Sequence, residues 1–208
     1  MKIYIVNSFV YRVFNSIRQL ISWYQRGLRP PSPMFVKHKI LIKNSVSNST
    51  WIETGTYLGQ TTNLLRKNSS KVYTFEPEIN LFHNAKNYLG RHNNVEVLNY
   101  TSEIGLKKIL PKITGNVNFW LDAHAVSNNK TKTYHGTTAN PILYELEAIE
   151  DSITNFNKVY IFMDDVDLLR PHENPDAPSL DYVIRWCKKN NLHWSIEHNI
   201  LVAKTNIF

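Results

Sequence analysis

From about residue 50 onward, the chain alternates short apolar or β-branched runs with longer windows of helical periodicity. This order is typical of a parallel β-sheet whose strands are joined by crossover helices. The predicted strands are 50–53, 71–76, 94–99, 116–122 and 158–163. The predicted helices are 58–68, 78–90, 101–110, 140–151 and 178–190. The pattern therefore predicts an α/β fold.

The chain closes with two strand-like runs, 193–197 and 200–204, separated only by His198 and Asn199. A link this short permits only an antiparallel pair. The expected sheet thus has seven strands, is mostly parallel, and ends in a C-terminal antiparallel hairpin. A length of 208 residues with 42% hydrophobic residues suits one globular domain.

The first acidic residue is Glu53, and eight lysines and arginines precede it. Apolar residues recur at spacings of three and four from 8 to 26, which predicts an amphipathic helix with arginines on its polar side. The following segment, 27–33, contains three prolines and is typical of a linker. We therefore divide the chain into a basic helix with its linker, 1–33, and a main domain, 34–208.

Two interpretations of the N-terminal helix stay open. In the first, the helix packs on the domain or across the interface of a homo-oligomer. In the second, it attaches to an anionic membrane surface, because basic residues beside an apolar face suit such attachment. A nucleic-acid partner is disfavoured, since the positive charge is confined to one leading segment and does not cover a reading face.

The expected cellular compartment is inferred from two sequence features that bear on secretion. The early uncharged stretch, Ile3–Tyr11, is only nine residues long and lacks a small-residue cleavage site after it. The single cysteine, Cys187, can form neither an internal disulfide nor a cysteine-based zinc site. We expect a cytoplasmic protein, held at the inner face of the membrane if the helix binds lipid.

A glycine-containing turn follows the first strand of the main domain. Gly55 and Gly59 lie four residues apart behind Glu53, with a helix opening after them. The spacing is not the Gly-x-Gly-x-x-Gly of dinucleotide sites, and no Gly-Lys-Ser or Gly-Lys-Thr indicates a P-loop. Bare backbone at such a turn lets a ligand approach closely. The candidate cofactor contacts here are Glu53, Gly55, Thr56, Tyr57, Gly59, Thr61 and Thr62.

Two further residues extend this candidate site. Glu76 ends the second strand 23 residues after Glu53, where a carboxylate can accept both ribose hydroxyls of a nucleoside. A solvated strand-end charge is the alternative interpretation of Glu76. Ser102, after the third strand, is expected near the base of that nucleoside, although serine is also an ordinary helix cap.

Acidic residues follow the fourth and fifth strands. Asp122 follows the fourth strand, and the pair Asp164 and Asp165 follows the fifth. Neighbouring parallel strands would bring these three carboxylates into one crevice. Three close carboxylates repel one another, and a hard cation such as Mg²⁺ prefers oxygen ligands. The alternative is a helix cap with a solvated neighbour.

His124 is the candidate general base, because a neutral imidazole accepts a proton near neutral pH. A buried structural histidine and a metal ligand are the alternatives for His124. His135 and His172 are substitutes in neighbouring loops.

These motifs in this order resemble class I S-adenosylmethionine (SAM)-dependent methyltransferases over residues 34–204, and small bacterial methyltransferase-like proteins in particular. The matching stretches are Glu53–Gly59, Phe119–His124, Pro141–Ile149 and Asp164–Asp165. The resemblance implies a Rossmann-like methyltransferase fold with SAM as cofactor.

The three aspartates also resemble the metal site of Mg²⁺-dependent sugar O-methyltransferases. That likeness implies metal ligation by Asp122, Asp164 and Asp165, and deprotonation of the acceptor hydroxyl by Asp122 or His124. This chain has His124 where that group has an aspartate.

We therefore predict methyl transfer from SAM to a hydroxyl of a carbohydrate or glycoconjugate, assisted by a divalent metal. The polar stretch 125–140 is long for a strand-to-helix loop and is expected to cover the acceptor. Methylation of RNA or of another small molecule is one alternative. A noncatalytic protein of this fold, which binds membranes or partners through residues 1–33, is the other.

Overall fold

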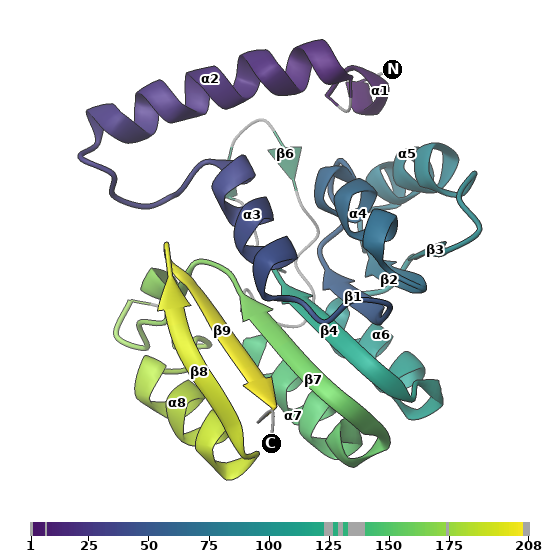
Figure 1. Ribbon diagram of the computed structural model, residues 1–208, viewed down its shortest axis with the longest axis vertical. Coiled ribbons are helices and arrows are strands. Elements are labelled where there is room, and N and C mark those ends of the chain that lie inside the picture. The colour runs from purple at the N-terminus through teal and green to yellow at the C-terminus, as the bar shows by residue number, and fades with distance from the viewer. Residues whose placement is uncertain are drawn as a thin grey trace.

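The computed structural model describes residues 2–6, 8–122, 127–128, 131–132, 140–173 and 175–205. It contains a seven-stranded sheet in the order β3-β2-β1-β4-β7-β9-β8 (Figure 1). The strands are β1 (Thr50–Thr54), β2 (Lys71–Phe75), β3 (Val95–Leu98), β4 (Gly115–Leu121), β7 (Phe156–Met163), β8 (Leu192–Glu197) and β9 (Ile200–Thr205). The first five run parallel, whereas β9 is antiparallel to both β7 and β8. The predicted sheet and its terminal hairpin are confirmed.

The crossover helices follow the predicted order. They are α4 (Gln60–Leu65), α5 (Ile79–Leu89), α6 (Ser102–Ile109), α7 (Ile142–Ser152) and α8 (Leu180–Lys189). Short 3₁₀ turns, η1 (Arg66–Asn68), η2 (Leu110–Lys112) and η3 (Ile153–Asn155), follow α4, α6 and α7, while η4 (Val166–Leu168) follows β7. Helix α4 starts later than predicted because Gly59 adopts a left-handed conformation, with φ of 65°, and caps the helix. Within the loop after β4, β5 (Ser127–Asn128) and β6 (Thr131–Lys132) form an antiparallel pair.

Successive side chains of the central strands point to opposite faces of the sheet and belong to two separate hydrophobic cores. This is expected for a sheet that is covered on both faces. Ile52 and Phe119 belong to the core that also includes residues of α6, α7 and α8. Trp51 and Trp120 belong to the core formed with α3, α4 and α5. Helices therefore cover both faces of the sheet (Figure 1), and its carboxyl edge is left for a site.

The sequence predicts no helix for residues 34–44, where the structure has α3 (Met34–Asn44). Its buried face contains Lys37 beside Ile40 and Leu41. A lysine at a core position interrupts the apolar period, and this explains why the helix is hard to recognise in the sequence. As Figure 1 shows, α3 stands over the carboxyl edge of the sheet.

The N-terminal strap consists of residues 2–6 and 8–33 and contains α1 (Lys2–Val6) and α2 (Phe9–Gln25). At one end, the Tyr4 ring packs edge-on against Tyr88 of α5, with centroids 5.2 Å apart. At the other end, Trp23 packs on His198 in the β8–β9 turn, with centroids 5.6 Å apart. Between these contacts, α2 passes above α3 (Figure 1). The predicted helix at 8–26 is thus present as α2.

Candidate functional site at the carboxyl edge

The register of the central strands brings the acidic residues together. Thr54 of β1 pairs with Leu121 of β4, which pairs in turn with Met163 of β7. Asp122 and Asp164 are the next residues, and the Asp164 amide donates to the Leu121 carbonyl at 3.0 Å. Asp165 follows with a φ of 49°. The structure therefore places all three predicted aspartates at one edge, as the topology argument expects.

A lysine lies within this acidic cluster. Lys37 Nζ is 2.5 Å from Asp164 Oδ2 and 3.3 Å from Asp165 Oδ1. The Lys37 side chain is only 7% exposed and that of Asp164 only 2%. Burial alone would lower the pKa of Lys37, but the negative charges of Asp164 and Asp165 outweigh burial and raise it. Lys37 therefore stays charged and is the counter-ion of the aspartates.

Two of the aspartates, Asp122 and Asp164, are weakened as acids in this setting. Burial raises the pKa of Asp164 to about 6, although Lys37 acts in the opposite direction. Burial, followed by repulsion from Asp164, raises the pKa of Asp122 well above its usual range. Asp122 is partly exposed as a residue, whereas Asp164 is buried. Asp122 is therefore the more accessible residue of this pair.

The arrangement does not fit a ready-made Mg²⁺ site. Asp164 Oδ2 accepts from Lys37, and Asp164 Oδ1 accepts from the backbone N–H of Asp165 at 2.9 Å. Within the part of the chain that the structure describes, no three histidine, cysteine or acidic side chains are grouped to hold a metal. A divalent ion would have to displace Lys37 from Asp164. Metal ligation by Asp122, Asp164 and Asp165 is thus a prediction from the sequence alone, and in this arrangement Lys37 supplies the positive charge beside Asp164 and Asp165.

The turn after β1 is built on two buried glutamates. Glu53 is 1% exposed, and its Oε2 accepts from Thr62 Oγ1 at 2.5 Å and from Thr74 Oγ1 at 2.7 Å. Burial raises the pKa of Glu53 to about 7, against the effect of these two hydrogen bonds. Glu53 and Thr62 thus join β1, α4 and β2 from inside.

Glu76 holds the other side of the same turn. Its Oε2 accepts from the Tyr57 amide at 2.8 Å, and its Oε1 accepts from the Glu78 amide at 3.1 Å. Burial raises the pKa of Glu76, while these backbone bonds counteract the shift. Each carboxylate oxygen keeps a further lone pair, so Glu76 can still accept from ribose hydroxyls.

The remaining predicted cofactor contacts differ in exposure. Tyr57 is 43% exposed at the turn. Thr56 is buried, with its Oγ1 2.6 Å from Thr74 Oγ1, and Thr61 Oγ1 lies 3.3 Å from His38 Nε2. Gly55 has a φ of 97°, a conformation that glycine adopts without strain. Gly59 is needed for another reason, since a Cβ there would lie 2.9 Å from Leu89 Cδ1.

A second pair of buried polar groups lies between α6 and α7. Ser102 Oγ and both carboxylate oxygens of Glu145 are buried, and no described residue gives them a hydrogen bond of normal geometry. Burial raises the pKa of Glu145 to about 7, although the nearby hydroxyls of Ser102 and Thr54 act to lower it. Ser102 and Thr54 are therefore the polar neighbours of Glu145 at this buried position.

The sequence-based predictions do not single out Lys37 or Glu145, which the structure buries near the carboxyl edge. A signal for Glu145 exists, because it shares one face of α7 with the buried residues Ile142, Leu146 and Ile149. A charged residue at a core position needs a partner or a function. Lys37 carries the same signal on α3.

The predicted histidines and most of the predicted acceptor loop are not among the described residues of the acidic cluster. His124 and His135 lie outside the described residues, so their roles stay predictions. His172 is on the surface, 3.5 Å from Glu173, and is no part of the acidic cluster. Of the predicted acceptor loop, the described residues are 127–128, 131–132 and Asn140.

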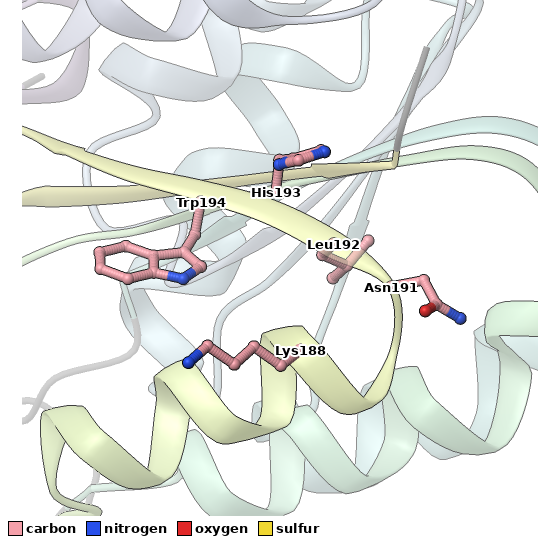
Figure 2. Close-up of a pocket in the computed structure, with 5 residues that line it drawn as sticks. All are labelled: Lys188, Asn191, Leu192, His193 and Trp194. Carbon is pink, nitrogen blue, oxygen red and sulfur yellow. The ribbon is translucent and has the colours of Figure 1, made fainter. Parts of the chain in front are cut away.

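A hollow of about 460 Å³ beside β8 is separate from this site. It is lined by Lys188, Asn191, Leu192, His193 and Trp194 (Figure 2). Leu192 pairs with Thr205, whose neighbour Lys204 pairs with Tyr160, well before the end of β7. The hollow therefore lies toward the amino end of β7, away from Asp164.

Comparison with known proteins identifies the fold. No family model matches the chain, and no curated protein matches it. Among solved structures, an rRNA methylase from Streptococcus thermophilus has a TM-score of 0.50 at 16% identity, covering 86% of this chain and 98% of that one. A SAM-dependent methyltransferase from Aquifex aeolicus has a TM-score of 0.51 at 19% identity, covering 87% and 96%.

A third similar structure contains the demethylated cofactor. It is a putative methyltransferase from Streptococcus mutans in complex with SAH, with a TM-score of 0.50 at 16% identity, covering 84% of this chain and 99% of that one. These likenesses show that the chain has the fold of class I SAM-dependent methyltransferases.

Proposed function

We propose that the protein transfers the methyl group of SAM to a hydroxyl of a neutral, polyhydroxylated acceptor such as a carbohydrate or glycoconjugate. The observation that carries the proposal is the joint placement of two features at one edge of a methyltransferase-type sheet. One is the turn on Glu76, and the other is the acidic cluster of Asp122, Asp164 and Asp165 with Lys37.

The cofactor half of the site suits an adenosyl group. Glu76 has lone pairs for ribose hydroxyls, and Ser102 and Glu145 are neighbouring buried polar groups. SAM, when bound, supplies an electrophilic methyl carbon. The protein's part is to hold the cofactor and the acceptor in line, since methyl transfer needs an in-line approach.

The acceptor half suits hydroxyl groups. Carboxylate oxygens accept hydrogen bonds from hydroxyls, whereas they repel phosphates. Three carboxylates with one lysine make this edge a poor surface for RNA, so a neutral glycan is the better match. Similarity to rRNA-methylating proteins reflects the shared fold, and RNA is therefore kept as an outcome of the test.

Asp122 is the described residue best suited to accept the hydroxyl proton. A raised pKa makes a carboxylate a stronger base. Asp122 is also partly exposed, while Lys37 holds Asp164 in place. His124, two residues later, is the second candidate from the sequence.

The experiment uses the full chain with SAM carrying a labelled methyl group. Incorporation is measured into glycan and RNA fractions, the latter with and without ribonuclease, and SAH binding is measured by calorimetry. Label in a ribonuclease-resistant glycan supports the proposal. Label lost on ribonuclease treatment shows an RNA methyltransferase, and SAH binding without transfer to any fraction shows a noncatalytic protein.

Two matched variants test the role of Asp122. Asp122→Asn removes the base and should lower turnover by about 10²–10⁴-fold while SAH still binds. The control, Asp151→Asn, changes an exposed aspartate on α7 and should leave turnover unchanged. Full turnover in Asp122→Asn would exclude Asp122 as the base.

A further inference from the structure

Helix α2 turns its apolar side away from the domain. Phe9, Phe14 and Tyr24 are 73%, 68% and 77% exposed. Trp23 is the residue of α2 that is buried. The exposed apolar stripe consists of Phe9, Val10, Val13, Phe14, Ile17, Leu20, Ile21 and Tyr24. At 100° per residue these side chains span an arc of about 140° on one side of the helix.

The polar side of α2 faces the domain instead. Gln19 Oε1 accepts from the Met34 amide of α3 at 2.8 Å. Asn15, Ser16 and Gln19 line a small cavity with residues of α3 and α4. A helix that packs on its own domain normally buries its apolar stripe. Here the orientation is reversed, so the apolar stripe is available to something outside the chain.

A basic residue flanks the stripe on its outer side. On a helical projection, Arg18 lies about 40° beyond Phe14, at one edge of the stripe. Arg18 is exposed, whereas Arg12 lies on the domain side of α2 and lines the small cavity with Asn15 and Gln19. No acidic residue occurs before Glu53, so nothing in the segment neutralises Arg18. The outer surface of α2 is therefore apolar in the middle and positively charged at one edge.

This combination distinguishes between two occupants. A second copy of the chain, docked stripe to stripe about a two-fold axis, would bring like charges together at the edge of the stripe. An anionic lipid surface supplies both an apolar layer and the complementary negative charge. No described helix is long and apolar enough to cross a bilayer, and an amphipathic helix can lie in the plane of its surface.

We propose that α2 binds the surface of an anionic membrane. The exposed apolar stripe enters the boundary between headgroups and acyl chains, and Arg18 at its edge contacts lipid phosphates. Helix α3, which carries Lys37, lies on the other side of α2 (Figure 1). The carboxyl edge of the sheet is then held close to the membrane, whatever reaction it performs.

The test is co-sedimentation of the full chain with vesicles of phosphatidylcholine, with and without phosphatidylglycerol. We expect binding to the anionic vesicles at low salt, with a loss of about tenfold or more at about 0.5 M salt, where the charges are screened. No binding to anionic vesicles at low salt overturns the proposal. Equal binding to both vesicle types overturns the role of Arg18.

Paired substitutions show whether α2 is responsible. Ile17→Asp with Leu20→Asp places two charges in the stripe and should weaken binding by at least about tenfold. The control, Ile79→Asp with Ile104→Asp, changes two residues of similar exposure, 49% and 50%, on α5 and α6. It should leave binding unchanged. Equal loss in both variants overturns the assignment to α2.

The oligomeric state in the absence of lipid tests whether a second copy of the chain covers the apolar stripe. Sedimentation velocity at low and high salt measures whether the chain self-associates. A dimer that the Ile17→Asp, Leu20→Asp variant abolishes, combined with no vesicle binding, shows that a second copy covers the stripe and overturns the proposal. Circular dichroism confirms that each variant keeps the fold.

Discussion

Lys37 of α3 and Asp164 after β7 form a buried ion pair, with 2.5 Å between Nζ and Oδ2, although 127 residues separate them in the chain. Through this pair, the helix that follows the N-terminal strap is attached to the acidic end of the site. A buried pair of this kind is costly to break on one side only, because the remaining charge has no partner.

Lys37→Met should therefore destabilise the fold. We expect a loss of about 3–5 kcal/mol in the free energy of unfolding at neutral pH, since Asp164 and Asp165 lose their counter-ion. The loss should shrink as the pH falls, because without Lys37 the pKa of Asp164 rises further and the group takes up a proton. Urea unfolding followed by tryptophan fluorescence, at pH 7.5 and pH 5, measures both effects.

Two further variants separate charge from packing. Lys39→Met changes an exposed lysine of the same helix and should alter stability by no more than about 0.5 kcal/mol. Adding Asp164→Asn to Lys37→Met should recover part of the loss, because the unpaired charge is removed. A Lys37→Met protein as stable as the parent would show that the ion pair is unimportant.

Glu145 should make stability depend on pH. Its pKa is about 7 in the folded protein against 4.5 in its ordinary state, so the folded chain binds the proton more tightly than the unfolded chain. Stability therefore falls as pH rises from about 4.5 to about 7. Glu145→Gln should flatten this dependence and raise stability at pH 8, since no buried charge then has to form.

The control for this titration is Glu147→Gln, which removes an exposed carboxylate from the same helix. Its stability should follow the parent curve at every pH. Glu53, whose pKa is also raised to about 7, contributes in the same direction and leaves a residual slope in Glu145→Gln. An unchanged slope in Glu145→Gln would contradict the assignment.

Gly59→Ala should cost more stability than Gly27→Ala. The two glycines have almost the same φ, 65° and 64°, so both substitutions carry a backbone penalty of about 1 kcal/mol. A Cβ at Gly27 meets nothing within 4 Å, whereas one at Gly59 meets Leu89 at 2.9 Å. Overpacking adds about 1–3 kcal/mol at Gly59 alone. Equal losses in thermal unfolding would show that Leu89 moves aside freely.

Removal of divalent metal tests whether Lys37 or a metal ion neutralises the acidic cluster. With Lys37 bound to Asp164 and Asp165, we expect methyl transfer to survive EDTA with at least about half of its rate, which corresponds to a rise of under about 0.5 kcal/mol in the activation barrier. Loss of activity in EDTA that added Mg²⁺ restores would show that Lys37 leaves Asp164 in the working enzyme. The Asp165→Asn variant, assayed over a range of Mg²⁺ concentrations, provides an independent measurement.

The sheet could be predicted because its signals are local. Strand runs, glycine turns and the two-residue link at His198 and Asn199 each determine structure over a few residues. The convergence of Asp122 with Asp164 followed from topology, since neighbouring parallel strands end at the same edge.

The contacts that define the site could not be predicted in this way. The partner of Asp164 lies on a helix at the other end of the chain, and no local pattern indicates that α3 folds over the carboxyl edge. The orientation of α2 is a similar case. The apolar spacing predicts an amphipathic helix, but it does not determine which side of the helix faces the domain.

The N-terminal strap has a mechanical consequence. One end is held by Tyr88, beside the strands that form the glycine turn, and the other by His198, beside the strands that carry the acids. It braces the two halves of the sheet, which cannot separate without breaking one of these ring contacts. We expect detachment of either end to loosen α3 as well, because Gln19 of the strap accepts a hydrogen bond from the Met34 amide.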